Sequence, residues 1–178
     1  DLFDEVIAGL EPPFLVLPGN HDISDEATEE IWRERIGPTH YTFRYGNSLF
    51  VMLNSEEVGA VDRISDAQVA WLEEQLDATD AANIFVFVHK PYFAHGGDPD
   101  TADEEWEKKW ANVAATFEGH PVRAVFAGHR HTYRDFGMRD GVRYVICGGA
   151  SVYGMHGTEA EGNFNHYLRV QVRGTDFS

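Results

Sequence analysis

Three predominantly apolar runs are the strongest structural signal along this chain. They cover residues 14–17, 84–88 and 122–127. Each run is short, rich in β-branched and aromatic side chains, and followed by polar residues. That pattern is typical of strands that are buried on both faces of a sheet. We therefore expect these three segments to form the interior of a sheet that other layers cover on both sides.

Two further segments, 41–45 and 168–172, alternate between apolar and polar residues instead. Alternation places the apolar side chains on one face, which predicts strands with one side exposed to solvent. The pairs Gly46-Asn47 and Asp140-Gly141 are favoured in the tight turns of hairpins. We expect antiparallel ribbons around both turns.

Three segments carry helix signals. Residues 65–68 (Ser-Asp-Ala-Gln) and 101–104 (Thr-Ala-Asp-Glu) match a capping box, and each precedes apolar residues at helical spacing. A third helix is expected from Ser24 or Asp25 to Ile36. Buried strands, helices and ribbons together predict a layered α/β fold with two packed sheets. A chain of 178 residues suits a single domain over 1–178.

The charge balance narrows the possible partners. Fourteen Lys and Arg residues face 30 Asp and Glu residues, which gives a formal net charge of −16. Such a field argues against general nucleic-acid binding, and it repels phosphorylated molecules unless bound cations reverse the sign locally. No apolar run approaches the roughly 20 residues of a membrane span. These features favour a soluble, cytoplasmic protein, although they do not fix the compartment.

Each buried run leads into polar residues that can bind metals or act on protons. Pro-Gly-Asn-His-Asp follows the first run at 18–22, His89-Lys90-Pro91 follows the second, and Gly-His-Arg-His follows the third at 128–131. Ligands of open α/β sheets bind beyond the carboxyl ends of the strands. We therefore expect imidazole and amide groups from three strands to meet at one edge.

The spacing within these clusters suits two metal ions. His129 and His131, at i and i+2 of an extended segment, point the same way with Cα atoms roughly 6–7 Å apart. They could serve metals roughly 3.5–4 Å apart. Asn20 offers a neutral oxygen, and Asp22 could orient His21 as carboxylates orient working imidazoles. Taken alone, each motif also fits a packing pair of histidines or an ordinary β-turn.

Together, the residues Gly19-Asn20-His21-Asp22, the isolated His89 and the Gly-His-Arg-His of 128–131 resemble the calcineurin-like metallophosphoesterase family in order and spacing. The resemblance implies a four-layer sandwich of two mixed β-sheets flanked by helices. It also implies a centre of two divalent or trivalent metal ions, with Mn, Fe, Zn, Co and Ni all compatible.

The resemblance assigns roles to individual residues. Asn20, His89 and His129 resemble the ligands of one metal, and His131 resembles a ligand of the other. His21 matches the family histidine that stabilises the transition state or protonates the leaving oxygen, and Asp22 matches its partner. For Arg130 and His95, contact with the substrate is a further expectation.

One part of the family pattern is absent from this sequence. The family has an upstream Asp-x-His and a Gly-Asp-x-x-Asp or Gly-Asp-x-x-Asn segment, and neither precedes Gly19 here. We expect a metallophosphoesterase domain that is incomplete at its N-terminus and lacks its first strands. A missing N-terminal segment or a complementing chain would supply them.

The leading hypothesis is metal-dependent hydrolysis of a small phosphate ester. Phosphomonoesters and phosphodiesters, cyclic nucleotides included, fit equally well. The nucleophile would be a hydroxide activated by the two metals, which lower the pKa of bound water. Two alternatives remain open: a mononuclear hydrolase, and a non-catalytic metal-binding or scaffolding module of the same fold.

Overall fold

The computed structural model describes most of the chain. The residues outside the description are 1–4, 6, 61–62, 95–103 and 150–157, together with the side chains of 104–108.

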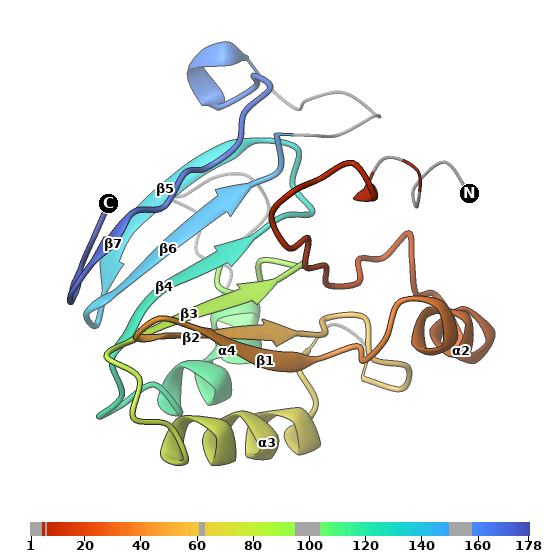
Figure 1. The fold of residues 1–178 in the computed structure, drawn as a ribbon, viewed down its shortest axis with the longest axis horizontal. Helices are drawn as coiled ribbons and strands as arrows, with labels where there is room; N and C mark the ends of the chain where they lie inside the picture. The colour runs from red at the N-terminus through yellow and green to blue at the C-terminus, as the bar shows by residue number, and fades with distance from the viewer. Residues whose placement is uncertain (1–4, 6, 61–62, 95–103, 150–157) are drawn as a thin grey trace.

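A six-stranded mixed sheet forms the centre of the molecule (Figure 1). Its order is β1-β2-β3-β4-β6-β5; β2, β3, β4 and β6 run parallel, whereas β1 and β5 pair antiparallel at the two edges. The strands are β1 (Tyr41–Tyr45), β2 (Ser48–Leu53), β3 (Asn83–Val88), β4 (Val122–Ala127), β5 (Tyr133–Arg139) and β6 (Val142–Cys147).

The second and third apolar runs are confirmed as the central strands β3 and β4. Both predicted hairpin turns are confirmed as well. Tyr45 pairs with Ser48 around Gly46-Asn47, and Arg139 pairs with Val142 around Asp140-Gly141. Asp140 and Gly141 have φ values of 50° and 81°, which matches the left-handed backbone that such two-residue turns require.

Helices α3 (Asp66–Asp77) and α4 (Glu104–Ala115) cover one face of this sheet (Figure 1). Alternate residues of β2, β3, β4 and β6 point to this face and form the main core with the helices. The third predicted helix is confirmed as α2 (Glu26–Arg35), capped by Asp25. Residues 101–103 of the expected second capping box lie outside the described residues.

The N-terminus of α3 differs from the predicted capping box in one respect. The Ser65 hydroxyl accepts the backbone N–H of Gln68 at 3.1 Å, as expected for an N-cap. The Gln68 amide does not turn back to Ser65, however. It accepts the Asn54 N–H at 2.7 Å and donates to the Asn54 carbonyl at 3.0 Å. Buried backbone groups need hydrogen-bond partners, so the Gln68 side chain binds the backbone of Asn54 and does not complete the capping box.

Ser65→Ala tests the half of the cap that forms. We expect the free energy of unfolding to fall by about 1 kcal/mol, since the substitution leaves an N-terminal N–H of α3 without its side-chain acceptor. Urea denaturation monitored by circular dichroism measures this loss. Ser65→Asp restores an acceptor and should recover most of the stability; an unchanged midpoint for Ser65→Ala would contradict the assignment.

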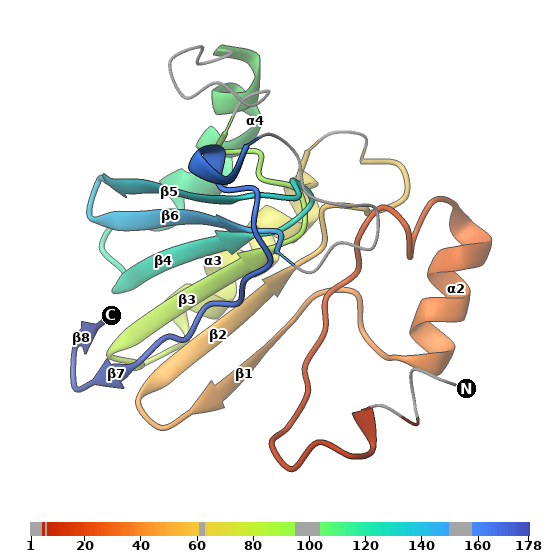
Figure 2. The ribbon, with the colours of Figure 1, turned by 90° about the horizontal axis from the view of Figure 1, so that it is seen from above.

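The opposite face of the sheet carries a row of aromatic side chains, which we call the aromatic face (Phe43, Phe50, Phe85, Phe87 and Phe126). Neighbouring rings stack across the strands, with centroids 4.7 Å apart for Phe43–Phe50 and 5.2 Å for Phe87–Phe126. The C-terminal segment crosses this face and ends in the ribbon of β7 (Val172–Arg173) and β8 (Asp176–Phe177) (Figure 2). Phe177 packs edge-on against Phe85 at 5.6 Å.

Two expected strands are not present on this side. Residues 14–17 and 168–171 have no place in a strand ladder, and the side chains of Phe14 and Leu15 are 52% and 44% exposed. A strand requires a hydrogen-bonded neighbour, and the described residues provide no backbone partner for 14–17 or 168–170. Gln171 exchanges two backbone hydrogen bonds with Ser178, and Val172 begins β7, so only the end of the strand predicted at 168–172 forms. The prediction of a buried strand at 14–17 is therefore wrong for this structure. Both segments instead border a cavity of about 470 Å³ over Phe87 and Phe126.

The predicted mixed α/β class is confirmed. In the described part, helices cover one face of the six-stranded sheet, whereas a two-stranded ribbon and a largely irregular segment lie on the other. Among the described residues, we find no helix that combines the length and the apolar character needed to cross a membrane.

Candidate metal centre

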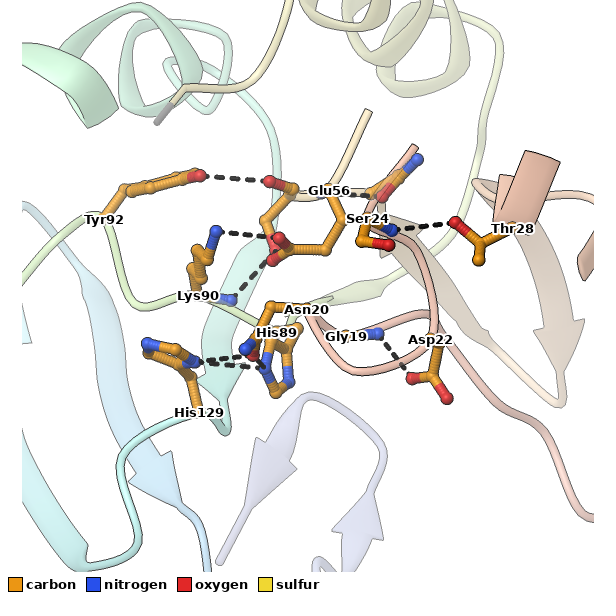
Figure 3. A network of polar contacts seen from close by, with 12 residues as sticks. Gly19, Asn20, Asp22, Ser24, Thr28, Glu56, His89, Lys90, Tyr92 and His129 are labelled. Atoms are coloured by element: carbon orange, nitrogen blue, oxygen red, sulfur yellow. Dashed lines mark hydrogen bonds and ion pairs between the residues drawn. The ribbon is translucent and has the colours of Figure 1, made fainter. Parts of the chain in front are cut away.

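Three polar side chains from distant parts of the sequence converge at the carboxyl edge of the sheet (Figure 3). His89 follows β3, His129 follows β4, and Asn20 lies in the turn after residues 14–17. The Asn20 Oδ1 lies 2.8 Å from His89 Nε2 and 3.0 Å from His129 Nδ1. The two ring nitrogens lie 3.2 Å apart. We call these three residues the donor triangle.

Hydrogen bonds alone cannot satisfy the donor triangle. Oδ1 of Asn20 only accepts, and each imidazole nitrogen carries at most one proton. If both imidazole nitrogens donate their protons to Asn20 Oδ1, no proton is left for the contact between the two nitrogens. If one nitrogen donates to the other instead, one of the contacts with Oδ1 has no proton. A cation at the centre would face a lone pair from each corner. One amide oxygen and two imidazoles are also donors that Zn²⁺, Mn²⁺ and iron accept, so the residues fit a metal.

The turn that carries Asn20 is closed by its own backbone and by Asp22. The Gly19 carbonyl accepts the N–H groups of Asp22 and Ile23 at 2.9 and 3.1 Å. The Asp22 carboxylate accepts the Gly19 N–H at 2.8 Å. This contact fixes the turn, and the expected pairing of Asp22 with His21 stays a prediction. A Cβ at position 19 would lie 2.9 Å from the His89 ring, so the absence of a side chain there admits the imidazole.

The histidine loop after β4 has a different backbone from the one predicted. His129 has a φ of 62°, and residues 129–132 form bends, so the assumption of an extended segment from His129 to His131 is wrong. Left-handed backbone at a non-glycine residue costs on the order of 1–3 kcal/mol, and such conformations cluster at functional sites. This turn brings the His129 ring back over His89, with centroids 5.0 Å apart.

Burial and neighbouring cations keep the imidazoles neutral. Burial lowers the pKa of His89 to about 4, and His129, Lys90, His21 and His131 contribute by charge repulsion. Burial also lowers the pKa of His129, again with help from Lys90. Neutral rings at pH 7 keep their lone pairs available to a metal. His21 directly follows Asn20, and His131 lies two residues after His129, so both belong to the segments that form the donor triangle.

The remaining predicted residues lie around or beyond the triangle. Arg130 is half-buried, and burial together with the charge of Arg134 lowers its pKa. His95 lies outside the described residues. His21 is exposed and His131 is half-buried. Within the described part of the chain, histidine, cysteine and carboxylate side chains form no metal group of three, so the amide of Asn20 is needed to complete the triangle.

One polar group beside the triangle was not predicted. The Glu56 carboxylate, after β2, pairs with the Lys90 ammonium at 2.7 Å (Figure 3). The sequence did contain a signal for it, because Asn54-Ser55-Glu56 follows the apolar residues 49–53 as the other polar clusters follow their strands.

An amide and two imidazoles at the carboxyl edge of a mixed sheet define a candidate metal site in an α/β protein. Comparison with known protein families identifies the family to which this α/β protein belongs. The model of the calcineurin-like phosphoesterases matches residues 1–133, and the chain belongs to this family.

Curated relatives and solved structures agree with that membership. The chain is 30% identical to the serine/threonine-protein phosphatase CPPED1 of Rattus norvegicus over 71% of its own length and 45% of the relative. It is 28% identical to a probable glycerophosphodiester phosphodiesterase GpdQ of Arcobacter nitrofigilis, over 51% of its own length and 35% of the relative's length. A purple acid phosphatase from yellow lupin has the same fold (TM-score 0.61, 16% identity, 77% of this chain and 31% of that one). The chain thus spans less than half the length of these proteins.

Proposed function

We propose that this chain forms the larger part of the active site of a metal-dependent phosphoesterase. The donor triangle carries the proposal, because its mutual distances of 2.8–3.2 Å place three lone-pair donors around one point. Membership in the calcineurin-like phosphoesterase family supports hydrolysis of phosphate esters as the reaction.

Each residue has a part in this proposal. Asn20, His89 and His129 hold one cation, and His131 contributes to a second. When bound, such cations supply Lewis-acid polarisation of the phosphoryl group and lower the pKa of water. His21 donates a proton to the departing oxygen, a role typically worth ~10²–10⁴-fold. Arg130 binds a phosphoryl oxygen.

We propose that carboxylate ligands come from polypeptide beyond the described residues. The aromatic face and its cavity support this part of the proposal, since Phe87 and Phe126 are only half-buried beneath it. Segments 14–17 and 168–170 flank the cavity without strand partners among the described residues, so added strands would pair with them and cover the rings. A neighbouring segment or a second chain could supply those strands.

The ester itself is proposed only by class. One curated relative carries the name of a protein phosphatase and another that of a phosphodiesterase. Both a phosphomonoester and a phosphodiester are therefore suitable substrates to test. The −16 charge repels either anion, and bound cations would reverse the sign of the charge at the site.

Metal stoichiometry and turnover test the proposal together. We expect this chain with its natural flanking sequence to bind two Mn²⁺ per chain and to hydrolyse p-nitrophenyl phosphate or its bis ester. Chelation should abolish turnover, and added Mn²⁺ should restore it. One bound metal with slow turnover would indicate a mononuclear hydrolase. Metal binding without turnover on either ester would contradict catalysis and indicate a binding module.

A further inference from the structure

Glu56 and Lys90 form an ion pair directly behind the donor triangle. Their side chains are only 6% and 20% exposed, and Glu56 Oε2 lies 2.7 Å from Lys90 Nζ. The Ser55 hydroxyl accepts the Lys90 backbone N–H at 3.0 Å and donates to Glu56 Oε1 at 2.9 Å. Both polar ends of Lys90, the residue after His89, are thus tied to the end of β2 in a closed ring of contacts.

The ammonium of Lys90 would repel a metal cation at the donor triangle. Lys90 is a positive charge one residue after His89, at the same edge of the sheet as the donor triangle (Figure 3). A cation in that position repels a divalent metal, and partial burial weakens the screening by solvent. The Glu56 carboxylate, 2.7 Å from the ammonium, has the opposite charge and opposes this repulsion.

We propose that Glu56 is a positioning residue that neutralises Lys90 and orients the loop of His89, so that a divalent cation can bind the donor triangle. This inference rests on the proposed function, because it assumes a metal at Asn20, His89 and His129. It extends that function by giving a specific electrostatic role to a buried carboxylate that is not itself a ligand.

A double-mutant cycle on Mn²⁺ affinity tests the role. Glu56→Gln keeps the shape and leaves Lys90 as an uncompensated cation, so the dissociation constant for Mn²⁺ should rise about 10–100-fold, as for other groups behind metal ligands. Lys90→Met removes the repulsion and leaves a carboxylate beside the metal, so binding should tighten. The double variant should return to the wild-type affinity. Isothermal titration calorimetry on the full chain with its flanking sequence measures all four proteins.

Two further variants separate charge from packing. Ser55→Ala breaks the hydroxyl contacts without changing charge, and it should weaken Mn²⁺ binding much less than Glu56→Gln. Asp80→Asn removes an equal charge from the exposed pair with Arg44, before the other end of β3, and should leave Mn²⁺ affinity unchanged.

The outcomes distinguish this inference from the proposed function. If wild-type protein binds no Mn²⁺, the proposed function itself fails. If wild-type protein binds Mn²⁺ but Lys90→Met does not tighten binding, or the double variant stays as weak as Glu56→Gln, the compensating role is overturned and the metal site stands. Equal losses for Ser55→Ala and Glu56→Gln would likewise overturn it, because only contact geometry would then matter. If Glu56→Gln does not fold, tighter binding by Lys90→Met still supports the role and unchanged or weaker binding overturns it.

Discussion

His89→Ala should eliminate tight Mn²⁺ binding and reduce phosphoesterase turnover by roughly 10³-fold, since several kcal/mol of transition-state stabilisation come from a bound metal. The His89 ring contacts both other members of the donor triangle, so its loss removes one donor and leaves the other two without a common centre. Calorimetric titration with Mn²⁺ and steady-state hydrolysis of a nitrophenyl ester measure the two effects.

His120→Ala is the matched control for this loss. His120 precedes β4 at the opposite end of the strand from His129 and pairs with Asp77 at 3.4 Å. Its removal deletes an imidazole from the same sheet without touching the donor triangle, so Mn²⁺ affinity should not change. Wild-type affinity in His89→Ala would show that the metal binds elsewhere, and the assignment of the site would be wrong.

Gly148→Ala should impair the site although Gly148 is not one of its donors. A methyl group there would overlap the Arg130 carbonyl oxygen and lie 3.1 Å from the His131 Cα. The atoms in the way are backbone, so the loop between β4 and β5 must move, and with it His129. A displacement of about 1 Å in a catalytic group can cost ~10²-fold. Turnover and Mn²⁺ affinity should therefore fall together.

General destabilisation has to be separated from displacement of the loop. Gly119 has a φ of 79°, lies in open space and precedes β4 at the opposite edge of the sheet. Gly119→Ala strains the backbone and should lower the free energy of unfolding without altering Mn²⁺ affinity. If Gly148→Ala retains wild-type affinity and turnover, the loop tolerates the methyl group and the prediction is wrong.

Local signals in the sequence were sufficient to predict the elements whose interacting residues are close along the chain, and those whose composition fits only one kind of element. The apolar runs predicted β3 and β4 because a parallel central strand must be apolar on both faces. Asp140-Gly141 predicted its hairpin because two adjacent residues with positive φ favour such a pair. Asp25 predicted the start of α2, since its side chain accepts the N–H of Thr28 three residues later.

Predictions that depended on distant partners were wrong more often. The run at 14–17 has the composition of a buried strand, yet a strand forms only beside another strand, which the sequence of the run does not reveal. Gln68 has the spacing of a capping box, but the buried backbone of Asn54 binds its amide. The left-handed turn at His129 also has no local signature, because the surrounding fold stabilises it.

The sequence by itself therefore determined the chemistry of this protein: which donor groups follow which strands, and that they are amide and imidazole rather than thiolate. Only the tertiary structure decided which of them touch. Asn20 meets His89 across 69 positions and His129 across 109, and Glu56 meets Lys90 from a neighbouring strand. The register of the parallel strands β2, β3 and β4 sets the contacts between Glu56 and Lys90 and between His89 and His129, because its backbone hydrogen bonds align the strand ends irrespective of their separation along the chain. Asn20 reaches the two imidazoles from a turn outside the sheet.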